Sequence, residues 1–345
     1  MTWDHIRIAR FGGPDVLELV HESIMPEPGP GEVRLRVIAA GTGFTDSFIR
    51  RGRYPDFKGP LPFTPGYDLV GIVEQHGPGV TSPPIGQIVA DLCVTGGYTQ
   101  YAIRPANGLV PVPDGLDPAE AVCIPLAYLT AFQMLTRCQH LAPGATILVI
   151  GASGTVGTAL LDLARALGLN AIGTCSAANM PIVERFGATA IDYRNGDFVA
   201  AVHRLTTISQ GTSGVAAAFD AIGGPHFSRS FACLAQGGLL VGYGSQTMAT
   251  GRESLLAAAL GIARLKLWNS LSPLFGGRRA CWYSITDRRK THQDDFKSDM
   301  ALLFQRLHNH TIHPTVIDRL PLAAAQTVHR RIDAGGLGGK IVLLP

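Results

Sequence analysis

Hydrophobic and polar positions follow two different patterns in the two parts of this chain. From Ile147 onward, short apolar runs alternate with stretches of helical periodicity. Such runs are typical of parallel strands buried on both faces, and the periodic stretches are typical of amphipathic helices. This part of the sequence therefore predicts a doubly wound α/β domain, with strands at 147–150, 171–175, 190–193, 215–221 and 238–243.

The first 122 residues lack this alternation and predict a compact β-rich domain. Segments such as Val33–Ala40 alternate like strands, and prolines punctuate the connections between them. Strand-like sequence returns at 316–317 and at Lys340–Leu344, so the α/β domain is expected to be inserted into the β-rich one.

Helical periodicity begins near Pro118, in a segment expected to link the two domains. Further along, 252–268 and Phe296–Leu307 are expected to be helical, with a buried amphipathic helix at Leu255–Ile262. Between them, Ala280–Ile285 predicts a strand.

A glycine-rich turn follows the first strand of the α/β domain. Gly151, Gly154 and Gly157 are spaced as G-x-x-G-x-x-G, and helical periodicity resumes directly after them. Small residues let the backbone approach a pyrophosphate, and the helix N-terminus supplies unpaired N–H groups and partial positive charge. The context favours a dinucleotide site over a plain tight turn. The candidate binding residues in this turn are Gly151, Ser153, Gly154, Thr155, Val156 and Gly157.

The end of the next strand favours NADPH as the cofactor. An NAD site usually carries Asp or Glu there to hold the ribose hydroxyls, but this chain has Cys175, Ser176 and Ala177. An acidic residue would repel a 2′-phosphate, so its absence favours NADPH. Arg185 and Arg194 are the candidates to neutralise that phosphate, and the sequence does not choose between them.

Composition indicates a globular enzyme rather than a nucleic-acid-binding or disordered chain. Hydrophobic residues make up 46% of the sequence and charged residues 16%, and the net charge is only +3. The basic stretch at 288–292 is expected to be a solvated loop. No signal-peptide core and no apolar run of membrane-spanning length stands out, so we expect no stable membrane insertion.

The cysteines and histidines do not predict a metal site. The six cysteines are scattered without a C-x-x-C pair, which suits a reducing, cytoplasmic location and argues against structural zinc. His308, His310 and His313 form a His-x-His-x-x-His pattern, but no carboxylate or cysteine stands beside them at ligand spacing.

With these segments placed, the chain resembles the zinc-independent quinone oxidoreductase group of the medium-chain dehydrogenase/reductase superfamily. The matching stretches include AAGTGFTDSFIRRGRYP (39–55), PFTPGYDLVGIVEQHGPGV (62–80), PGATILVIGASGTVG (143–157) and GLGGKIVLLP (336–345). The resemblance implies a GroES-like catalytic domain at 1–124 and 287–345, and a Rossmann NADPH-binding domain at 125–286.

Three features of zinc-dependent relatives are absent from the sequence. The catalytic cysteine is missing from the Thr42–Thr45 segment, Gly66-Tyr67-Asp68 stands in place of Gly-His-Glu, and no four-cysteine lobe surrounds Cys93. Without a Lewis acid, hydrogen-bond donors must polarise the substrate. The resemblance places the substrate beside Thr42, Gly43, Phe44 and Tyr67; Gly43 replaces a frequent asparagine of the family, so either Thr42 or Thr45 substitutes or the pocket is wider.

The resemblance also assigns roles to individual residues. Tyr54 is the candidate catalytic residue, which would protonate the α-carbon or hold an enolate oxygen. Asp46 matches a recurrent aspartate, with a helix-capping role expected from Ser47 onward. The predicted cofactor contacts outside the glycine-rich turn are Thr130 at the nicotinamide, Ser176, Arg185 and Tyr193 at the adenosine phosphate, and Ile222, Tyr243, Gly244 and Ser245 along the ribose and nicotinamide.

These assignments imply hydride transfer from NADPH to a quinone or to an activated C=C bond of an enone or enoyl group. One alternative is an enoyl-thioester reductase acting on an acyl carrier or coenzyme A, with Arg50, Arg51 and Arg53 at the mouth of the site. Another is a nucleotide-binding protein with little turnover, crystallin-like or membrane-associated. A homodimer is expected, with edge pairing of the 280–285 strand as one route.

Overall fold

The computed structural model describes residues 2–211, 213–251 and 254–345, and the chain divides into two compact units. Unit 1 comprises Met1–Leu129 with Arg289–Pro345, and unit 2 comprises Thr130–Arg288. The division expected from the sequence, 1–124 with 287–345 and 125–286, differs by a few residues at each junction.

Unit 2 is built on a six-stranded sheet in which every neighbouring pair of strands is parallel. Its spatial order is that of the doubly wound dinucleotide-binding fold. In that order, the strands are β10 (Thr189–Asp192), β9 (Asn170–Cys175), β8 (Thr146–Ile150), β11 (Val215–Asp220), β12 (Leu234–Gly242) and β13 (Arg279–Trp282).

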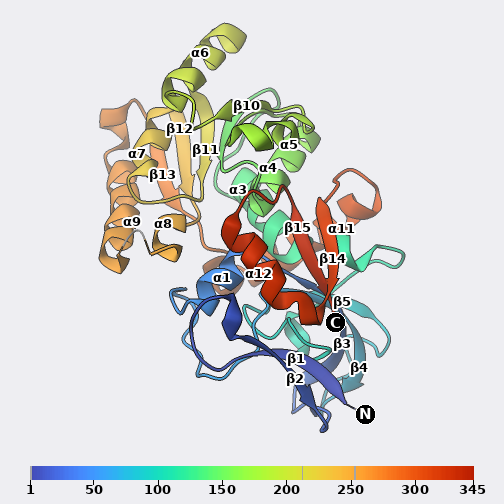
Figure 1. Ribbon diagram of the computed structural model, residues 1–345. Helices are drawn as coiled ribbons and strands as arrows, with labels where there is room; N and C mark the ends of the chain where they lie inside the picture. Colours follow the sequence, from blue (N-terminus) through green and yellow to red (C-terminus); the bar gives the residue numbers. More distant parts are fainter. Residues whose placement is uncertain (1, 212, 252–253) are drawn as a thin grey trace. The chain divides into compact units, whose positions relative to one another are not determined.

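Helices cover both faces of this sheet. Phe198, Phe227 and Leu265 pack from α6, α7 and α9 onto Leu148 of β8 and its neighbours. Figure 1 shows α4 on the other side of these strands. The helices of this part of the chain are α3 (Leu129–Arg137), α4 (Thr155–Ala166), η4 (Ala177–Asn179), α5 (Met180–Glu184), α6 (Phe198–Gln210), α7 (His226–Ala232), α8 (Gln246–Ala249), α9 (Leu255–Ser270), η5 (Ser272–Phe275) and α10 (Ile285–Thr291).

Unit 1 is built on a seven-stranded sheet and a two-stranded sheet. The order of the larger sheet is β14-β15-β3-β4-β5-β7, with β6 also paired to β3, and the smaller sheet pairs β1 with β2. Its strands are β1 (Trp3–Ile8), β2 (Leu17–Glu22), β3 (Glu32–Gly41), β4 (Asp68–His76), β5 (Ile88–Asp91), β6 (Tyr101–Pro105), β7 (Val110–Pro111), β14 (Val316–Pro321) and β15 (Lys340–Leu344). Its helices are η1 (Pro14–Val16), α1 (Phe44–Arg50), η2 (Ala106–Gly108), α2 (Pro118–Ala121), the π-helical turn η3 (Ile124–Tyr128), α11 (Gln293–His308), η6 (Leu322–Ala324) and α12 (Ala325–Ala334).

The end of the chain returns to the sheet of unit 1. Strand β15 pairs antiparallel with β3, where Val342 lies opposite Gly41 and Leu343 opposite Ala40. Ile341 and Leu343 are fully buried in a cluster with Ile6, Ile8 and other residues near the start of the chain. The last strand is therefore part of the core of unit 1.

The structure corrects three local predictions. The strand expected at 280–285 ends at Trp282, and Ile285 already begins α10. The basic stretch expected to be a loop lies largely in α10, where Arg289 forms an ion pair with Asp91 at 2.8 Å. The helix expected to be buried at Leu255–Ile262 lies in α9, which exposes 71% of Leu256 and 60% of Leu260. Residues 252–253 of the helix expected at 252–268 lie outside the described part of the chain.

One segment is long and apolar enough to cross a membrane by length and composition, which corrects the expectation that none would be. It is the continuous helical stretch Pro118–Arg137, with a mean hydropathy of 1.3 in its most apolar window. Within the protein, 83% of that window is buried. Core helices of globular proteins share this pattern, because a helix that is apolar all round is buried.

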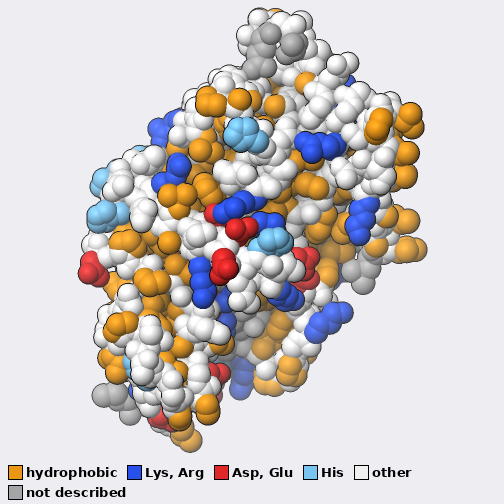
Figure 2. Space-filling model, turned by 180° about the vertical axis from the view of Figure 1, so that it is seen from behind, with side chains coloured by type: hydrophobic (Ala, Val, Ile, Leu, Met, Phe, Trp, Pro, Cys, Tyr) orange, Lys and Arg blue, Asp and Glu red, His pale blue; other side chains and the backbone are white. Residues whose placement is uncertain are grey.

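Charged side chains are interspersed on the face shown in Figure 2. Lys and Arg side chains lie among Asp, Glu and hydrophobic ones, and those drawn there form no extended patch of one sign. This distribution agrees with the low net charge of the sequence.

Candidate functional site

The glycine-rich turn lies between β8 and α4 of unit 2. Gly151 has φ +71°, a left-handed conformation that favours glycine, and a Cβ there would meet nothing within 4 Å. A Cβ on Gly157 would instead lie 2.5 Å from the Gly151 carbonyl oxygen, so this glycine permits the close approach of helix and strand. Gly154 is the N-cap of α4, and Thr155 and Val156 form its first turn. No side chain in the described part of the chain caps this helix, so its positive end is open to an anion.

Ser153, Ser176 and Tyr193 lie near the ends of the neighbouring strands. The Ser153 hydroxyl accepts a hydrogen bond from the Asn179 amide at 3.1 Å, across the turn that Ser176 begins after β9. The Tyr193 N–H donates to the Cys175 carbonyl at 3.1 Å, which holds the exposed tyrosine beside the end of β9. Asn179 was not among the predicted residues, because a lone polar residue in a short helical turn gives no sequence signal.

Asp220, the last residue of β11, holds the turn that follows this strand. Asp220 was not among the site residues predicted from the sequence. Its buried carboxylate accepts hydrogen bonds from the Ile222 N–H at 2.7 Å and from the Ser230 hydroxyl at 2.6 Å. The Tyr243 N–H donates to the Asp220 carbonyl at 3.0 Å, so Tyr243, Gly244 and Ser245 follow directly beside the Ile222 turn. An aspartate at a strand end satisfies backbone N–H groups that would otherwise be unpaired.

Thr130 in unit 2 has a buried hydroxyl that could contact a ligand. Its side chain is only 5% exposed, and its Oγ1 has no hydrogen-bond partner in the described part of the chain. A buried hydroxyl without a partner costs free energy unless a ligand or water satisfies it. The predicted alternative, a helix threonine bonded to its own backbone, does not account for this atom.

The residues of unit 2 fit a dinucleotide. Because parallel strands end at one edge of the sheet, the segments after β8, β9, β10, β11 and β12 all open onto that edge. Three separate features suit a bound nucleotide. The N-terminus of α4 has no side-chain cap, there is open space above Gly151, and the buried Thr130 hydroxyl has no partner in the described part of the chain. Arg185 is exposed at the end of α5, with its guanidinium 4.8 Å from the Phe186 ring, and Arg194 lies 5.6 Å from the Tyr193 ring.

In unit 1, Tyr54 and Tyr67 form a hydrogen-bonded pair. Their hydroxyl oxygens are 2.7 Å apart, and the Phe48 ring packs edge-on against Tyr54. Tyr67 is fully buried directly before β4, and burial, followed by the neighbouring Tyr54, raises the pKa of Tyr67 well above its usual value. Tyr54 is partly exposed in the loop after α1. Tyr67 therefore keeps its proton and is suited to donate a hydrogen bond to Tyr54.

The segment from Thr42 to Asp46 turns from β3 into α1. The Thr42 hydroxyl is buried and donates to the Ile341 carbonyl at 2.6 Å. Gly43 is the N-cap of α1, Phe44 is its first residue, and the Gly43 N–H donates to the Asp46 carboxylate at 2.8 Å. Helix α1 therefore begins at Phe44, before the expected start at Ser47. Asp46 does cap the helix, but from its third position.

Burial changes the protonation of Asp46. Burial raises its pKa to about 7, and the negative charge of Asp68 adds to this effect. Lys340 and the N–H groups of Gly43 and Tyr67 act in the opposite direction. Because Asp46 is only 1% exposed, its neutral form is populated in the folded protein at neutral pH.

Lys340, the first residue of β15, is buried in unit 1. It is 1% exposed, and its Nζ lies 2.5 Å from the Asp68 carboxylate and 3.2 Å from the Val122 carbonyl. Burial by itself lowers the pKa of Lys340, but Asp68 and further acidic neighbours raise it by more, so the lysine stays charged. The sequence gives no signal for this pair, because its members are 272 residues apart.

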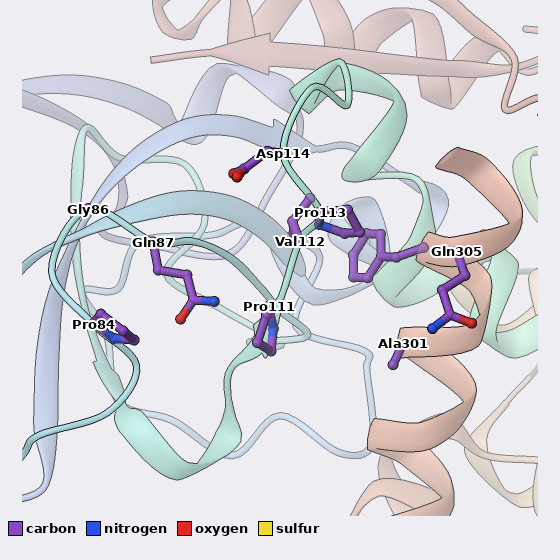
Figure 3. A pocket seen from close by; sticks show the side chains of 10 residues that line it. Pro84, Gly86, Gln87, Pro111, Val112, Pro113, Asp114, Ala301 and Gln305 are labelled. Carbon is purple, nitrogen blue, oxygen red and sulfur yellow. The ribbon is translucent and has the colours of Figure 1, made fainter. Parts of the chain in front are cut away.

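A separate hollow of about 600 Å³ lies on unit 1 and contains none of the predicted site residues. Its walls come from the loop before β5, from the segment around β7 and from α11 (Figure 3). Pro84, Pro111 and Pro113 are among its lining residues, and the side chains of Gln87, Asp114 and Gln305 are its polar groups. It shows no concentration of reactive groups.

In the described residues, no group of three or more His, Cys, Asp or Glu side chains is arranged to hold a metal ion. Arg50, named as a cation for a thioester substrate, is completely buried and forms an ion pair with Asp333 at 2.6 Å. Arg51 also pairs with Asp333, at 2.8 Å. Arg50 is therefore unavailable to an external carrier.

Family models match both units of the chain. The model described as alcohol dehydrogenase GroES-like domain matches residues 29–114, and the one described as zinc-binding dehydrogenase matches residues 186–343. Among curated proteins, 2-haloacrylate reductase of Burkholderia sp is 30% identical over 98% of both chains. A synaptic vesicle membrane protein VAT-1 homolog of Rattus norvegicus is 33% identical over 97% of this chain and 82% of its own length.

The fold is also that of a solved quinone oxidoreductase. The Escherichia coli quinone oxidoreductase complexed with NADPH superimposes with a TM-score of 0.85 and 26% identity, over the full length of both chains. The sheet order, the glycine-rich turn and these matches define an oxidoreductase with a GroES-like and a Rossmann domain. The chain belongs to the quinone oxidoreductase group of the medium-chain dehydrogenase/reductase superfamily.

The raised pKa of Asp46 predicts how stability depends on pH. The pKa is about 7 in the fold and 3.8 in the unfolded chain, so this group's contribution is complete below pH 4 and is lost as the pH rises through 7. The contribution is on the order of 4 kcal/mol. Asp46→Asn, which mimics the neutral acid, lacks this loss, so its stability relative to the wild type should increase as the pH rises from 4 to 8 in urea unfolding.

Asp114→Asn, at an exposed carboxylate of the same unit, is the matched control and should keep the wild-type profile. If Asp46→Asn and the wild type change in parallel over this range, Asp46 does not titrate as described.

Proposed function

We propose that the protein transfers hydride from NADPH to an activated C=C bond or a quinone, without a metal ion. The observation that carries the cofactor assignment is the open edge of the unit 2 sheet, with its glycine-rich turn, uncapped helix and unpartnered Thr130 hydroxyl. The complex of a related quinone oxidoreductase with NADPH supports the same choice. When bound, NADPH supplies the hydride.

The residues of this chain would then bind NADPH and orient it. The N-terminus of α4 and the backbone of Gly151–Gly157 would hold the pyrophosphate, and Thr130 would hydrogen-bond the nicotinamide. Ser176, Arg185 and Tyr193 are placed to contact the adenosine phosphate, while Ile222 and Tyr243–Ser245 would line the ribose and nicotinamide. These assignments follow from position at the sheet edge and from the family resemblance.

Polarisation of the substrate falls to hydrogen-bond donors. Zinc-dependent relatives carry metal ligands at two segments, which in this chain are Thr42–Thr45 and Gly66-Tyr67-Asp68. Neither segment contains Cys or His. The Thr42 hydroxyl is already donated to a backbone carbonyl, so the partly exposed Tyr54 hydroxyl is a better candidate donor than Thr42. Loss of its proton would leave a phenolate, which the Tyr67 hydroxyl at 2.7 Å would stabilise.

Three features of the structure bear on the alternatives named from the sequence, which are an enoyl-thioester reductase and a nucleotide-binding protein with little turnover. Burial of Arg50 weakens the case for an enoyl-thioester substrate on a carrier, because only Arg51 and Arg53 of the expected cations reach solvent. Burial of most of the Pro118–Arg137 window supports a protein that is not inserted in a membrane. All six cysteines are free, as expected in the cytoplasm. A nucleotide-binding protein with little turnover would bind NADPH and reduce none of the acceptors below.

Tyr54→Phe tests the proton donor and separates the two acceptor classes. Loss of the hydroxyl should lower kcat for a simple enone by about 10²- to 10⁴-fold, the usual contribution of a positioned acid. Reduction of a quinone, whose oxygens take protons from water, should fall by less than about 10-fold. NADPH oxidation with both acceptors measures this. Tyr67→Phe keeps the packing and should give an intermediate loss, whereas an unchanged enone rate in Tyr54→Phe would rule out the assignment.

Two arginine variants test the choice of NADPH. If one arginine pairs with the 2′-phosphate, its replacement by alanine should weaken NADPH binding by about 10- to 100-fold and leave NADH binding unchanged. Intrinsic fluorescence titration of Arg185→Ala and Arg194→Ala with both nucleotides measures this. Arg204→Ala, an exposed arginine of α6, is the control. An unchanged ratio of the two affinities in both variants would exclude both residues.

We also propose a homodimer formed by unit 2. Strand β13 is the last strand of its sheet, and the adjoining α9 exposes Leu256, Leu260 and Leu267 by 54–71%. An open edge beside exposed leucines is suited to a second copy of the chain, because pairing two identical edges buries both surfaces.

Leu260→Glu should therefore shift the protein from dimer to monomer in light scattering at micromolar concentration. Ile208→Glu changes a residue of α6 that is 78% exposed and should leave the dimer intact. A wild-type protein that is monomeric under these conditions would overturn the dimer.

A further inference from the structure

Two cysteines that are distant in sequence have adjacent thiols in unit 2. Cys138 follows α3 and Cys281 lies in β13, and their side chains form a hydrogen bond with each other. Both thiols are free, and both residues are partly exposed. An oxidant from solvent can therefore reach a ready-made dithiol.

Hydrogen bonds on both sides of the pair fix this arrangement. Arg279 donates to the Gln139 side-chain oxygen at 3.4 Å, and the Tyr283 hydroxyl donates to Gln133 of α3 at 2.8 Å. Arg279, Cys281 and Tyr283 alternate along an extended segment, so they share one face of the sheet. The segment from α3 to Gln139 lies along that face, and β13 keeps its outer backbone edge for other contacts.

The two thiols are chemically different. The hydrogen bond from Cys281 lowers the pKa of Cys138, burial opposes this, and the positive charge of Arg288 lowers it further. The same hydrogen bond, together with burial, raises the pKa of Cys281. Burial raises the pKa of Cys123 and Cys233 to about 12. Cys138 is therefore the thiol best suited to attack an electrophile.

We propose that Cys138 and Cys281 form a reversible disulfide when the protein meets a hydroperoxide. The Cys138 thiolate attacks the peroxide oxygen, so the O–O bond breaks and a sulfenic acid forms; the departing hydroxide takes up the proton that the Cys138 thiol released and leaves as water. The Cys281 sulfur then attacks the sulfenic sulfur, which forms the S–S bond and expels hydroxide. The Cys281 proton and the hydroxide make a second water. The two sulfurs lose two electrons and the peroxide gains two.

The test treats the reduced full-length protein with hydrogen peroxide, then blocks remaining thiols and measures intact mass and peptides. The wild type should lose about 2 Da before blocking and should then carry two blocking groups fewer than the reduced protein, through a Cys138–Cys281 link that dithiothreitol reverses. Cys281→Ser should instead accumulate a sulfenic acid on Cys138, trapped by dimedone. Cys138→Ser should be oxidised about 10-fold more slowly than the wild type.

Cys175→Ser removes a buried thiol outside the pair and should behave like the wild type. The proposal is overturned if the wild type keeps both thiols open to alkylation, or if the link maps to other cysteines. It is also overturned if Cys281→Ser shows no oxidised Cys138, because the first step depends on Cys138 alone.

Discussion

The ion pair between Asp68 and Lys340 is the constraint on which unit 1 depends. It joins the first residue of β4 to the first residue of β15, and both side chains are only 1% exposed. Two charges removed from water cost several kcal/mol each unless they meet, and removal of one partner leaves the other buried and unpaired. The pair also dictates its surroundings: a Cβ on Gly41 would lie 2.2 Å from the Asp68 carboxylate and 2.5 Å from the lysine, so glycine is required there. Strand β15 is thus held to β3 and β4 by charge as well as by its backbone hydrogen bonds and buried side chains.

Elements whose signal is local were predictable from the sequence. The apolar runs of the parallel strands and the glycine-rich turn before α4 are such signals, and the structure places them as expected, within one or two residues for β8, β9, β10 and β11. The errors came where tertiary contacts override local pattern. Apolar residues of α9 were assumed to face the core, yet Leu256 and Leu260 are exposed, because periodicity shows that a face is apolar but not what covers it. The basic stretch at 288–292 was assumed to be a loop, yet Arg289 is held by Asp91, which lies 198 residues earlier in the chain.

The candidate site also has residues that a local sequence pattern predicts and residues that only tertiary contacts reveal. The nucleotide-binding turn was found because its residues are consecutive, and the strand ends followed from the rule that ligands bind at the carboxyl edge of parallel sheets. Asp220, Asn179 and the Asp68–Lys340 pair were missed or misplaced because their partners are distant in sequence or lie in the backbone. Tyr54 was singled out by its motif, but the hydroxyl of Tyr67 beside it is visible only in three dimensions. Candidate catalytic and binding residues can be predicted from a sequence, whereas their protonation states and their hydrogen-bond partners cannot.

The path of the chain also decides the order in which the units are completed during synthesis. Unit 2 lies between the two parts of unit 1 in sequence, so all of its residues leave the ribosome before β14 and β15 are made. Until then the Asp68 carboxylate has no Lys340, and Gly41 and Ala40 at the end of β3 lack the strand that pairs with them. The β-rich unit therefore keeps an open sheet edge until β15 is made. The Rossmann unit can fold earlier, because all of its residues lie in one contiguous segment. A chain that stops within unit 2 carries the whole nucleotide turn but leaves Asp68 without Lys340 and the end of β3 without β15, and an unpaired strand edge is prone to pair with another chain.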